Sequence, residues 1–166
     1  MSNLNLKKTI VDFVIFISIF LIDRISKIYI INIADLSNKV DMYIAPYLNF
    51  YLIWNKGIAF GFFSFDGNFI YDLISIIITI ICLVVLILII KNKGIKRYLL
   101  IFILGGAIGN LFDRIYYSAV PDFIDFHIGN YHWFIFNVAD IFITFGVICL
   151  ILVELIYKDK ANNNVN

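Results

Sequence analysis

Hydrophobic residues gather in four long runs along the chain, and the segments between them hold most of the charged and polar residues. The runs cover about residues 9–31, 69–90, 98–116 and 136–157. Each has roughly the 20 apolar residues that a helix needs to cross the hydrocarbon core of a bilayer. The pattern therefore predicts four transmembrane helices, all-α in class, within a single integral-membrane domain covering residues 1–166.

Composition supports a membrane protein and argues against a soluble one. Of the 166 residues, 62% are hydrophobic, more than a soluble domain of this size could bury. The mean hydropathy of +0.93 points the same way. A net charge of only +1 gives no overall field that would favour nucleic acid as a partner.

The distribution of basic residues predicts the orientation in the membrane. They precede the first run, lie between the second and third, and follow the fourth: Lys7, Lys8, Lys91, Lys93, Lys96, Arg97, Lys158 and Lys160. If the chain crosses the membrane four times, these three basic segments lie on the same side. Loops rich in Lys and Arg are normally cytoplasmic. Both termini are thus expected in the cytoplasm, and segments 32–68 and 117–135 on the outer face.

The two outer segments differ in pattern. Segment 32–68 is rich in aromatic and β-branched residues and is interrupted by Pro46 and Gly57, which predicts short strands with a turn. Segment 117–135 contains the aromatic run 131–134, typical of the boundary between lipid and water. The polar tail 161–166 predicts a frayed end.

Three acids on three predicted helices lie at nearly one depth. Asp23, Asp113 and Asp140 lie roughly 22, roughly 24 and roughly 27 Å from the basic residues at the cytoplasmic ends of their helices, at about 1.5 Å per residue. Charged groups inside spans normally face the bundle interior or a wet cavity. We therefore expect a polar site near the outer face, covered by the two outer segments.

Helical spacing shows which polar side chains share a face. Asn137, Asp140 and Thr144 form a stripe on the fourth helix. On the third helix, Gly105 and Gly109 form a small-xxx-small pair that allows a neighbouring helix to approach closely.

Other polar residues have a structural reading beside a functional one. Asp23 and Lys27, four apart, favour an ion pair more than chemistry. Asn110 can neighbour both Asp113 and Arg114, and that charged pair is more readily explained as a tie between helices. Asp140 can also be an acid favoured by the positive end of a helix dipole, and the residues alone leave this reading as open as a catalytic one.

Metal and cysteine chemistry are not predicted. His127 and His132 are five apart with no third ligand at a metal-binding spacing, so a zinc site is not expected. Asp125 reads as a helix cap or a solvated charge. Cys82 and Cys149 lie within apolar runs, where packing is the expected role.

Five short blocks occur in order and together resemble the lipoprotein signal peptidase family (signal peptidase II), which are aspartic proteases of bacterial membranes. The blocks span most of the chain: D-R-I-S-K at 23–27, N-K-G-I-A-F at 55–60, G-N-L-F-D-R at 109–114, V-P-D-F-I-D at 120–125 and F-N-V-A-D at 136–140. Any one block is a weak signal, but all five in order are specific. Two positions depart from the family pattern, where Arg24 replaces the usual Gln and Pro121 stands at a common aliphatic position.

The resemblance assigns roles to residues. It implies that Asp122 and Asp140 are the catalytic pair. It also implies that segment 32–68 forms a small sheet cradling the substrate and that segment 117–135 contains a short helix acting as a lid. The residues matching positions that shape or support the site are Asp23, Lys27, Asn55, Gly57, Gly109, Asn110, Asp113, Arg114, Asn137 and Ala139.

Two carboxyls fit amide hydrolysis without a metal or other cofactor. One ionised carboxylate takes a proton from water while its protonated neighbour polarises the scissile carbonyl, because two close carboxyls share a proton. The resemblance implies diacylglyceryl-modified prolipoproteins as substrates, cut just before the lipidated Cys, in the bacterial cytoplasmic membrane. With both acids in one chain, a monomer is expected.

Two alternatives compete with this hypothesis. A small transporter or membrane assembly subunit could use buried acids to bind a cation or stabilise the bundle, although an ion pathway would not need Asp122 in a loop. An intramembrane protease with a G-x-G-D motif is disfavoured, because the text at 105–110 is GGAIGN.

Overall fold

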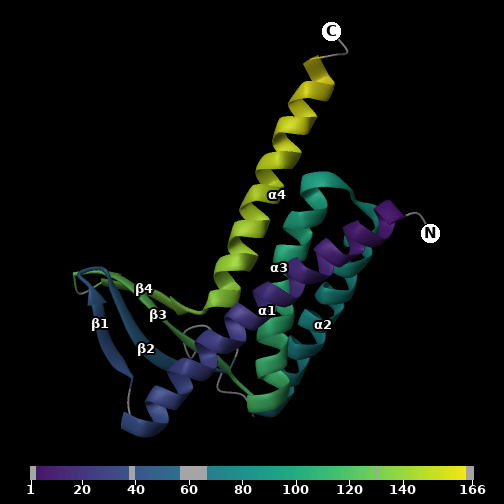
Figure 1. Ribbon diagram of the computed structural model, residues 1–166. Coiled ribbons are helices and arrows are strands. Elements are labelled where there is room, and N and C mark those ends of the chain that lie inside the picture. Colours follow the sequence, from purple (N-terminus) through teal and green to yellow (C-terminus); the bar gives the residue numbers. More distant parts are fainter. Residues whose placement is uncertain (1–2, 38–39, 57–66, 130, 164–166) are drawn as a thin grey trace.

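The computed structural model describes residues 3–37, 40–56, 67–129 and 131–163. Four helices and four strands follow one another along these ranges (Figure 1). In chain order they are α1 (Asn3–Ser37), β1 (Asp41–Ala45), β2 (Leu48–Asn55), α2 (Gly67–Lys91), α3 (Gly94–Tyr117), β3 (Val120–Ile128), β4 (Tyr131–Phe136) and α4 (Val138–Asn163).

Helix α3 is the centre of the bundle and packs against α1, α2 and α4. Its small residues permit this: a Cβ on Gly105 would lie 2.9 Å from Ile19 of α1, and one on Gly106 would lie 2.5 Å from the Ala139 carbonyl of α4. The close approach predicted for Gly105 is confirmed. Helix α3 therefore packs closely against the Ile19 side chain of α1 and the backbone of α4.

Among the described residues, three helices are long and apolar enough to cross a membrane: α2 over Tyr71–Lys91, α3 over Gly94–Tyr117 and α4 over Val138–Tyr157. Only 17% and 11% of the α2 and α4 spans are buried, against 61% of α3, so α2 and α4 present broad apolar faces outward. Helix α1 is longer, with 35 residues, but carries Asp12, Asp23, Arg24 and Lys27. The fourth predicted span therefore stays a prediction.

The strands form one antiparallel sheet in the order β1-β2-β3-β4 at one end of the bundle (Figure 1). A small core of Ile30, Val40 and Phe123 joins the sheet to α1. Both termini and the α2–α3 connection lie at the opposite end. The strands predicted within 32–68 are confirmed as β1 and β2.

The helix predicted within 117–135 is wrong: among the described residues of this segment, Val120–Ile128 and Tyr131–Ile135 are strand. The segment alternates with period two, since Phe123, Asp125 and His127 are buried while Phe126 and Ile128 are exposed. That period fits a strand with one covered face and not a helix. The segment 117–135 therefore belongs largely to the sheet.

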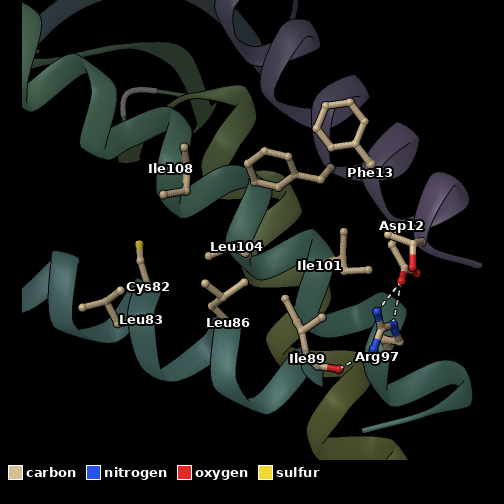
Figure 2. A pocket seen from close by; sticks show the side chains of 12 residues that line it. Asp12, Phe13, Cys82, Leu83, Leu86, Ile89, Arg97, Ile101, Leu104 and Ile108 are labelled. Atoms are coloured by element: carbon tan, nitrogen blue, oxygen red, sulfur yellow. Dashed lines mark hydrogen bonds and ion pairs between the residues drawn. The ribbon is translucent and has the colours of Figure 1, made fainter. Parts of the chain in front are cut away.

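An apolar groove of about 400 Å³ runs between α1, α2 and α3 at the end away from the sheet (Figure 2). Its walls include Phe13, Cys82 and Leu104, and an ion pair closes one end. There Arg97 Nε donates to Asp12 Oδ2 over 2.7 Å. This pairing of residues 85 positions apart was not predicted from the sequence. The pair fastens α1 to α3.

Candidate active site

Asp122 lies in β3 and is 5% exposed. Its Oδ2 accepts a hydrogen bond of 2.8 Å from Asn55 Nδ2, at the end of β2. Its Oδ1 accepts one of 2.6 Å from Asn137 Nδ2. The antiparallel register sets Ile53 opposite Asp122, so strand pairing brings Asn55 near the acid. Both carboxyl oxygens are thus fixed by amides from other segments.

Asp140 is the third residue of α4 and belongs to a capping box. The Asn137 backbone N–H donates to Asp140 Oδ2 over 3.0 Å, and the Asp140 N–H donates back to Asn137 Oδ1 over 3.1 Å. Reciprocal bonds of this kind satisfy backbone donors at a helix start. The prediction that Asp140 is an acid at a helix N-terminus is therefore confirmed. This local role is compatible with a catalytic one.

Asn137 joins the two acids through one side-chain amide. Its Oδ1 accepts the Asp140 N–H, so its Nδ2 is the end that faces Asp122. A single rigid group thus fixes one oxygen of Asp122 and the backbone of Asp140. The two carboxylates come from a strand and a helix, yet their relative position is set by one residue.

A second amide holds Asp140 from α3. Asn110 Nδ2 donates to Asp140 Oδ1 over 2.8 Å, and Asn110 Oδ1 accepts from Lys27 Nζ over 2.8 Å. A lysine ammonium can only donate, so it fixes which end of the Asn110 amide faces the acid. Lys27 therefore orients Asp140 through Asn110.

Lys27 also belongs to a buried cluster of two cations and two acids. Its Nζ lies 2.9 Å from Asp23 Oδ2 and 2.6 Å from Asp113 Oδ2. Arg24 reaches both acids as well, at 3.0 Å to Asp23 and 2.5 Å to Asp113. The predicted Asp23–Lys27 ion pair is confirmed. Arg24 and Lys27 together balance the charges of Asp23 and Asp113.

Asp23 links three helices. Its Oδ1 accepts the backbone N–H of Ala139 in the first turn of α4 over 3.0 Å. Gly109 of α3 makes room for this carboxylate, because a Cβ there would lie 2.6 Å from Asp23 Oδ2. Ala139 is fully buried beside them. The acid therefore fixes the start of α4, and with it Asp140.

Two predicted supporting residues differ from the rest. Arg114 is half-buried, and its Nη1 donates to the Asn110 carbonyl over 3.4 Å. Its own carbonyl accepts from the Tyr71 hydroxyl over 2.6 Å. Within the described residues, the Arg114 Nε makes no hydrogen bond. Gly57 lies outside the described residues.

Burial raises the pKa of Asp122 to about 6. Desolvation is the largest cause, since a buried carboxylate loses hydration. The amides of Asn55 and Asn137 oppose the rise by stabilising the ionised form, while the negative charge of Asp140 adds to it. The positive charge of Lys27 lowers the pKa of Asp122. Asp122 consequently holds a proton closer to neutral pH than an exposed aspartate does.

A second groove leads along α4 to Asp140. It has a volume of about 340 Å³ and is walled by aromatic and aliphatic side chains of β4 and α4, among them Phe136, Phe145 and Ile148. Thr144 and Asp140 supply its polar part. An extended apolar segment lying in this groove would meet a carboxylate at its end.

The model of the family described as signal peptidase (SPase) II matches residues 15–156 of the chain. The chain belongs to the signal peptidase II family. It is therefore a protease of the aspartic type with membrane character. Membership sets aside the reading as a non-enzymatic transporter or assembly subunit.

Curated relatives agree over the full length. A lipoprotein signal peptidase of Pelagibacter ubique is 52% identical over 166 residues, which is all of both chains. The protein of that name from Anaplasma phagocytophilum is 38% identical over 95% of this chain and 99% of its own length. The Aquifex aeolicus protein of that name is 39% identical over 90% and 89%.

A solved bacterial membrane enzyme also shares the fold. It superposes with a TM-score of 0.66 at 29% identity, covering 92% of this chain and 90% of its own. A second such structure gives 0.65 at 28% identity, covering 87% and 92%. The mostly helical architecture with a small antiparallel sheet is thus shared with known membrane enzymes.

In this signal peptidase II chain, twelve residues were predicted for the site, and ten of them belong to one connected set of contacts. Arg114 contacts that set through Asn110. Gly57 lies outside the described residues. Sequence reasoning did not find that Asn137 bridges Asp122 and Asp140. It also did not find that Arg24 pairs with Asp23 and Asp113. Spacing along one helix carries no information about partners on other elements, so only the fold could supply these contacts.

Proposed function

We propose that Asp122 and Asp140 are the catalytic pair of this peptidase. The observation that carries the proposal is the bridge through Asn137, which fixes acids from β3 and α4 against each other. Each acid has a second amide donor, Asn55 or Asn110, that holds its remaining oxygen. Two carboxyls held this firmly are preorganised for hydrolysis.

The two acids have different protonation roles. Asp122, with its pKa raised to about 6, carries the proton and donates it to the oxygen of the scissile carbonyl. Asp140, in the first turn of α4 where the dipole favours negative charge, takes a proton from the attacking water. The water oxygen adds to the carbonyl carbon and gives a neutral tetrahedral diol.

Collapse of this intermediate completes the reaction. Asp140 gives its proton to the departing nitrogen as the carbon–nitrogen bond breaks. One hydroxyl proton of the diol returns to Asp122, which restores the starting state. No covalent enzyme intermediate forms, and the proton shared by the pair is regenerated in every turnover.

The substrate is a prolipoprotein carrying a diacylglyceryl group on the Cys that follows the cut. The groove along α4 fits the apolar leader segment, because its walls are Phe and Ile and its polar end is Asp140. The relatives named lipoprotein signal peptidase support this substrate class. Asn55, beside Asp122, and Arg114, beside Asn110, position the peptide backbone next to the cut.

The enzyme spans the bacterial cytoplasmic membrane four times, with α1 as the remaining span. The buried ion cluster offsets the charges on the inner face of α1, so Asp23, Arg24 and Lys27 need not meet lipid. Both termini lie in the cytoplasm beside the basic α2–α3 connection, and the sheet lies outside. One chain supplies both acids, so a monomer is sufficient.

The test is a cleavage assay with purified protein in detergent and a diacylglyceryl-modified prolipoprotein. We expect Asp122→Asn and Asp140→Asn each to lower kcat by about a hundredfold to ten-thousandfold, the contribution that a general acid or base typically makes. Asp35→Asn, at an exposed position on α1, is the matched control and should cleave normally. Thermal unfolding checks that each variant folds. Near-normal cleavage by either folded variant would exclude the pair.

A further inference from the structure

A second cluster of ionisable groups lies on the sheet, apart from the catalytic pair. Asp125 and His127 come from β3, and His132 comes from β4. One ligand atom from each lies within 4.8 Å of the other two. The strands place them together because Asp125 and His127 share a face two residues apart, while His127 pairs across the ladder with His132.

The distances within the cluster suit a small divalent ion. His132 Nδ1 lies 2.8 Å from Asp125 Oδ2, and His127 Nδ1 lies 3.8 Å from the same oxygen. Two ligand atoms of a tetrahedral zinc, each about 2.1 Å from the metal, are about 3.4 Å apart. The two values fall on either side of this spacing and all three ligand atoms lie within 4.8 Å of one another, so binding the ion requires side-chain rotations that move these atoms by several tenths of an ångström or more.

Two buried polar atoms at the cluster lack a hydrogen bond within the described part of the chain. His127 is only 8% exposed, and its Nδ1 has no hydrogen-bond partner. Asn49 Oδ1 is also buried without one, and Asn49 is the β2 residue that pairs with Asp125. An unpaired buried acceptor is costly unless a ligand satisfies it.

We propose that Asp125, His127 and His132 bind one divalent transition-metal cation, with Zn²⁺ as the best match. Two imidazoles and a carboxylate are ligands that zinc accepts, and a water or the nearby Asn49 carbonyl completes a tetrahedron. In the sequence the two histidines have no third ligand at a metal-binding spacing, so a zinc site was not predicted. The strand register supplies that ligand as Asp125.

The metal would fasten β3 to β4 and would not take part in hydrolysis. Residues three apart on a strand project to opposite faces, so Asp125 points away from the face that carries Asp122. His132 is 56% exposed at its side chain, which leaves an entry path for the ion from solvent. The competing reading is a plain ion pair between Asp125 and His132, which binds no metal.

The experiment uses full-length protein without a polyhistidine tag, stripped with a chelator, desalted and titrated with Zn²⁺. We expect one Zn²⁺ per chain, and Co²⁺ should give the visible absorption of a tetrahedral site. His132→Gln should weaken binding at least tenfold; because this side chain is exposed, the variant should fold. The buried His127→Gln should do the same. The chain contains only these two histidines, so no other imidazole can substitute.

Two control variants locate the ion. Glu154→Gln removes a distant exposed carboxylate and should bind Zn²⁺ like wild type. Asp122→Asn should also bind normally, which separates this site from the catalytic pair. Absence of stoichiometric binding by wild type, or unchanged binding by both histidine variants, would overturn the proposal. So would loss of binding in Asp122→Asn alone.

Discussion

Asn137 combines two tasks that are usually divided between residues. As the cap of α4 it satisfies the Asp140 N–H, and with the other end of the same amide it holds Asp122. A change that disturbs the helix start therefore also disturbs the proposed catalytic pair. Stability of α4 and alignment of the acids are linked through a single side chain.

Asn55 should tune the pH dependence of cleavage. The folded-state pKa of Asp122 is raised to about 6, so its proton is bound below that pH and lost as pH rises through it. Wild-type kcat/KM should therefore decline as the pH rises above about 6, and this decline is the alkaline limb of the pH profile. Asn55→Leu removes a donor that lowers the pKa, so the limb should move to higher pH. The measurement is kcat/KM against pH; an unmoved limb would contradict the assignment.

Two lysines with equally short ion pairs should differ greatly in importance. Lys27 and Lys96 each lie 2.6 Å from a carboxylate, but Lys27 is fully buried and Lys96 is at the surface. Lys27→Met leaves two buried acids short of a cation and should cost about 3–5 kcal/mol of unfolding free energy. Lys96→Met should cost no more than about 1 kcal/mol.

Denaturant or thermal unfolding in detergent would measure both lysine variants under the same conditions. Lys27→Met should also lose activity beyond its loss of stability, because Asn110 is no longer oriented toward Asp140. Similar stabilities for the two variants would show that the buried cluster contributes little.

Among the elements, α3 contributes through its glycines, which let neighbouring groups approach its backbone. Gly109→Ala places a methyl 2.6 Å from an Asp23 oxygen that ion pairs hold in place, whereas Gly105→Ala meets only the Ile19 side chain. Both substitutions gain about 1 kcal/mol of helix propensity. We expect Gly109→Ala to lose about 1–3 kcal/mol net through overpacking and to cleave poorly. Gly105→Ala should lose less and keep its activity.

Unfolding and cleavage assays on the two alanine variants would separate these outcomes. Equal effects at both positions would mean that general crowding matters, and not the position of Asp23.

Apolar runs were sufficient to predict the helices, because a span of about 20 apolar residues has few other structures open to it. Depth along the helices brought Asp23 and Asp113 to one level, and both now contact Lys27. The outer segments were harder. The strands β3 and β4 depend on pairing with β2, and nothing local to 117–135 fixed that pairing. Asp12 and Asp125 were missed for the same reason, because their partners Arg97 and His132 lie on other elements.

For the molecule as a whole, the proposed topology places the sheet and the basic α2–α3 connection on opposite sides of the membrane, and this can be tested. Ile128→Cys, exposed on β3, should react with a membrane-impermeant maleimide added to intact cells. Lys93→Cys, between α2 and α3, should react only after the membrane is opened. Both changes are made with Cys82 and Cys149 replaced by Ala. The reverse pattern would invert the proposed topology.

The groove beside Asp140 has a consequence for how the enzyme meets its substrate. Its walls are apolar and it lies on a face of α4 that is otherwise turned outward. In the topology that we propose, a peptide reaches such a groove within the lipid layer, so the density of substrate per unit area should govern encounter. Adding empty micelles at constant bulk concentrations should slow cleavage, because enzyme and substrate are then spread over more surface.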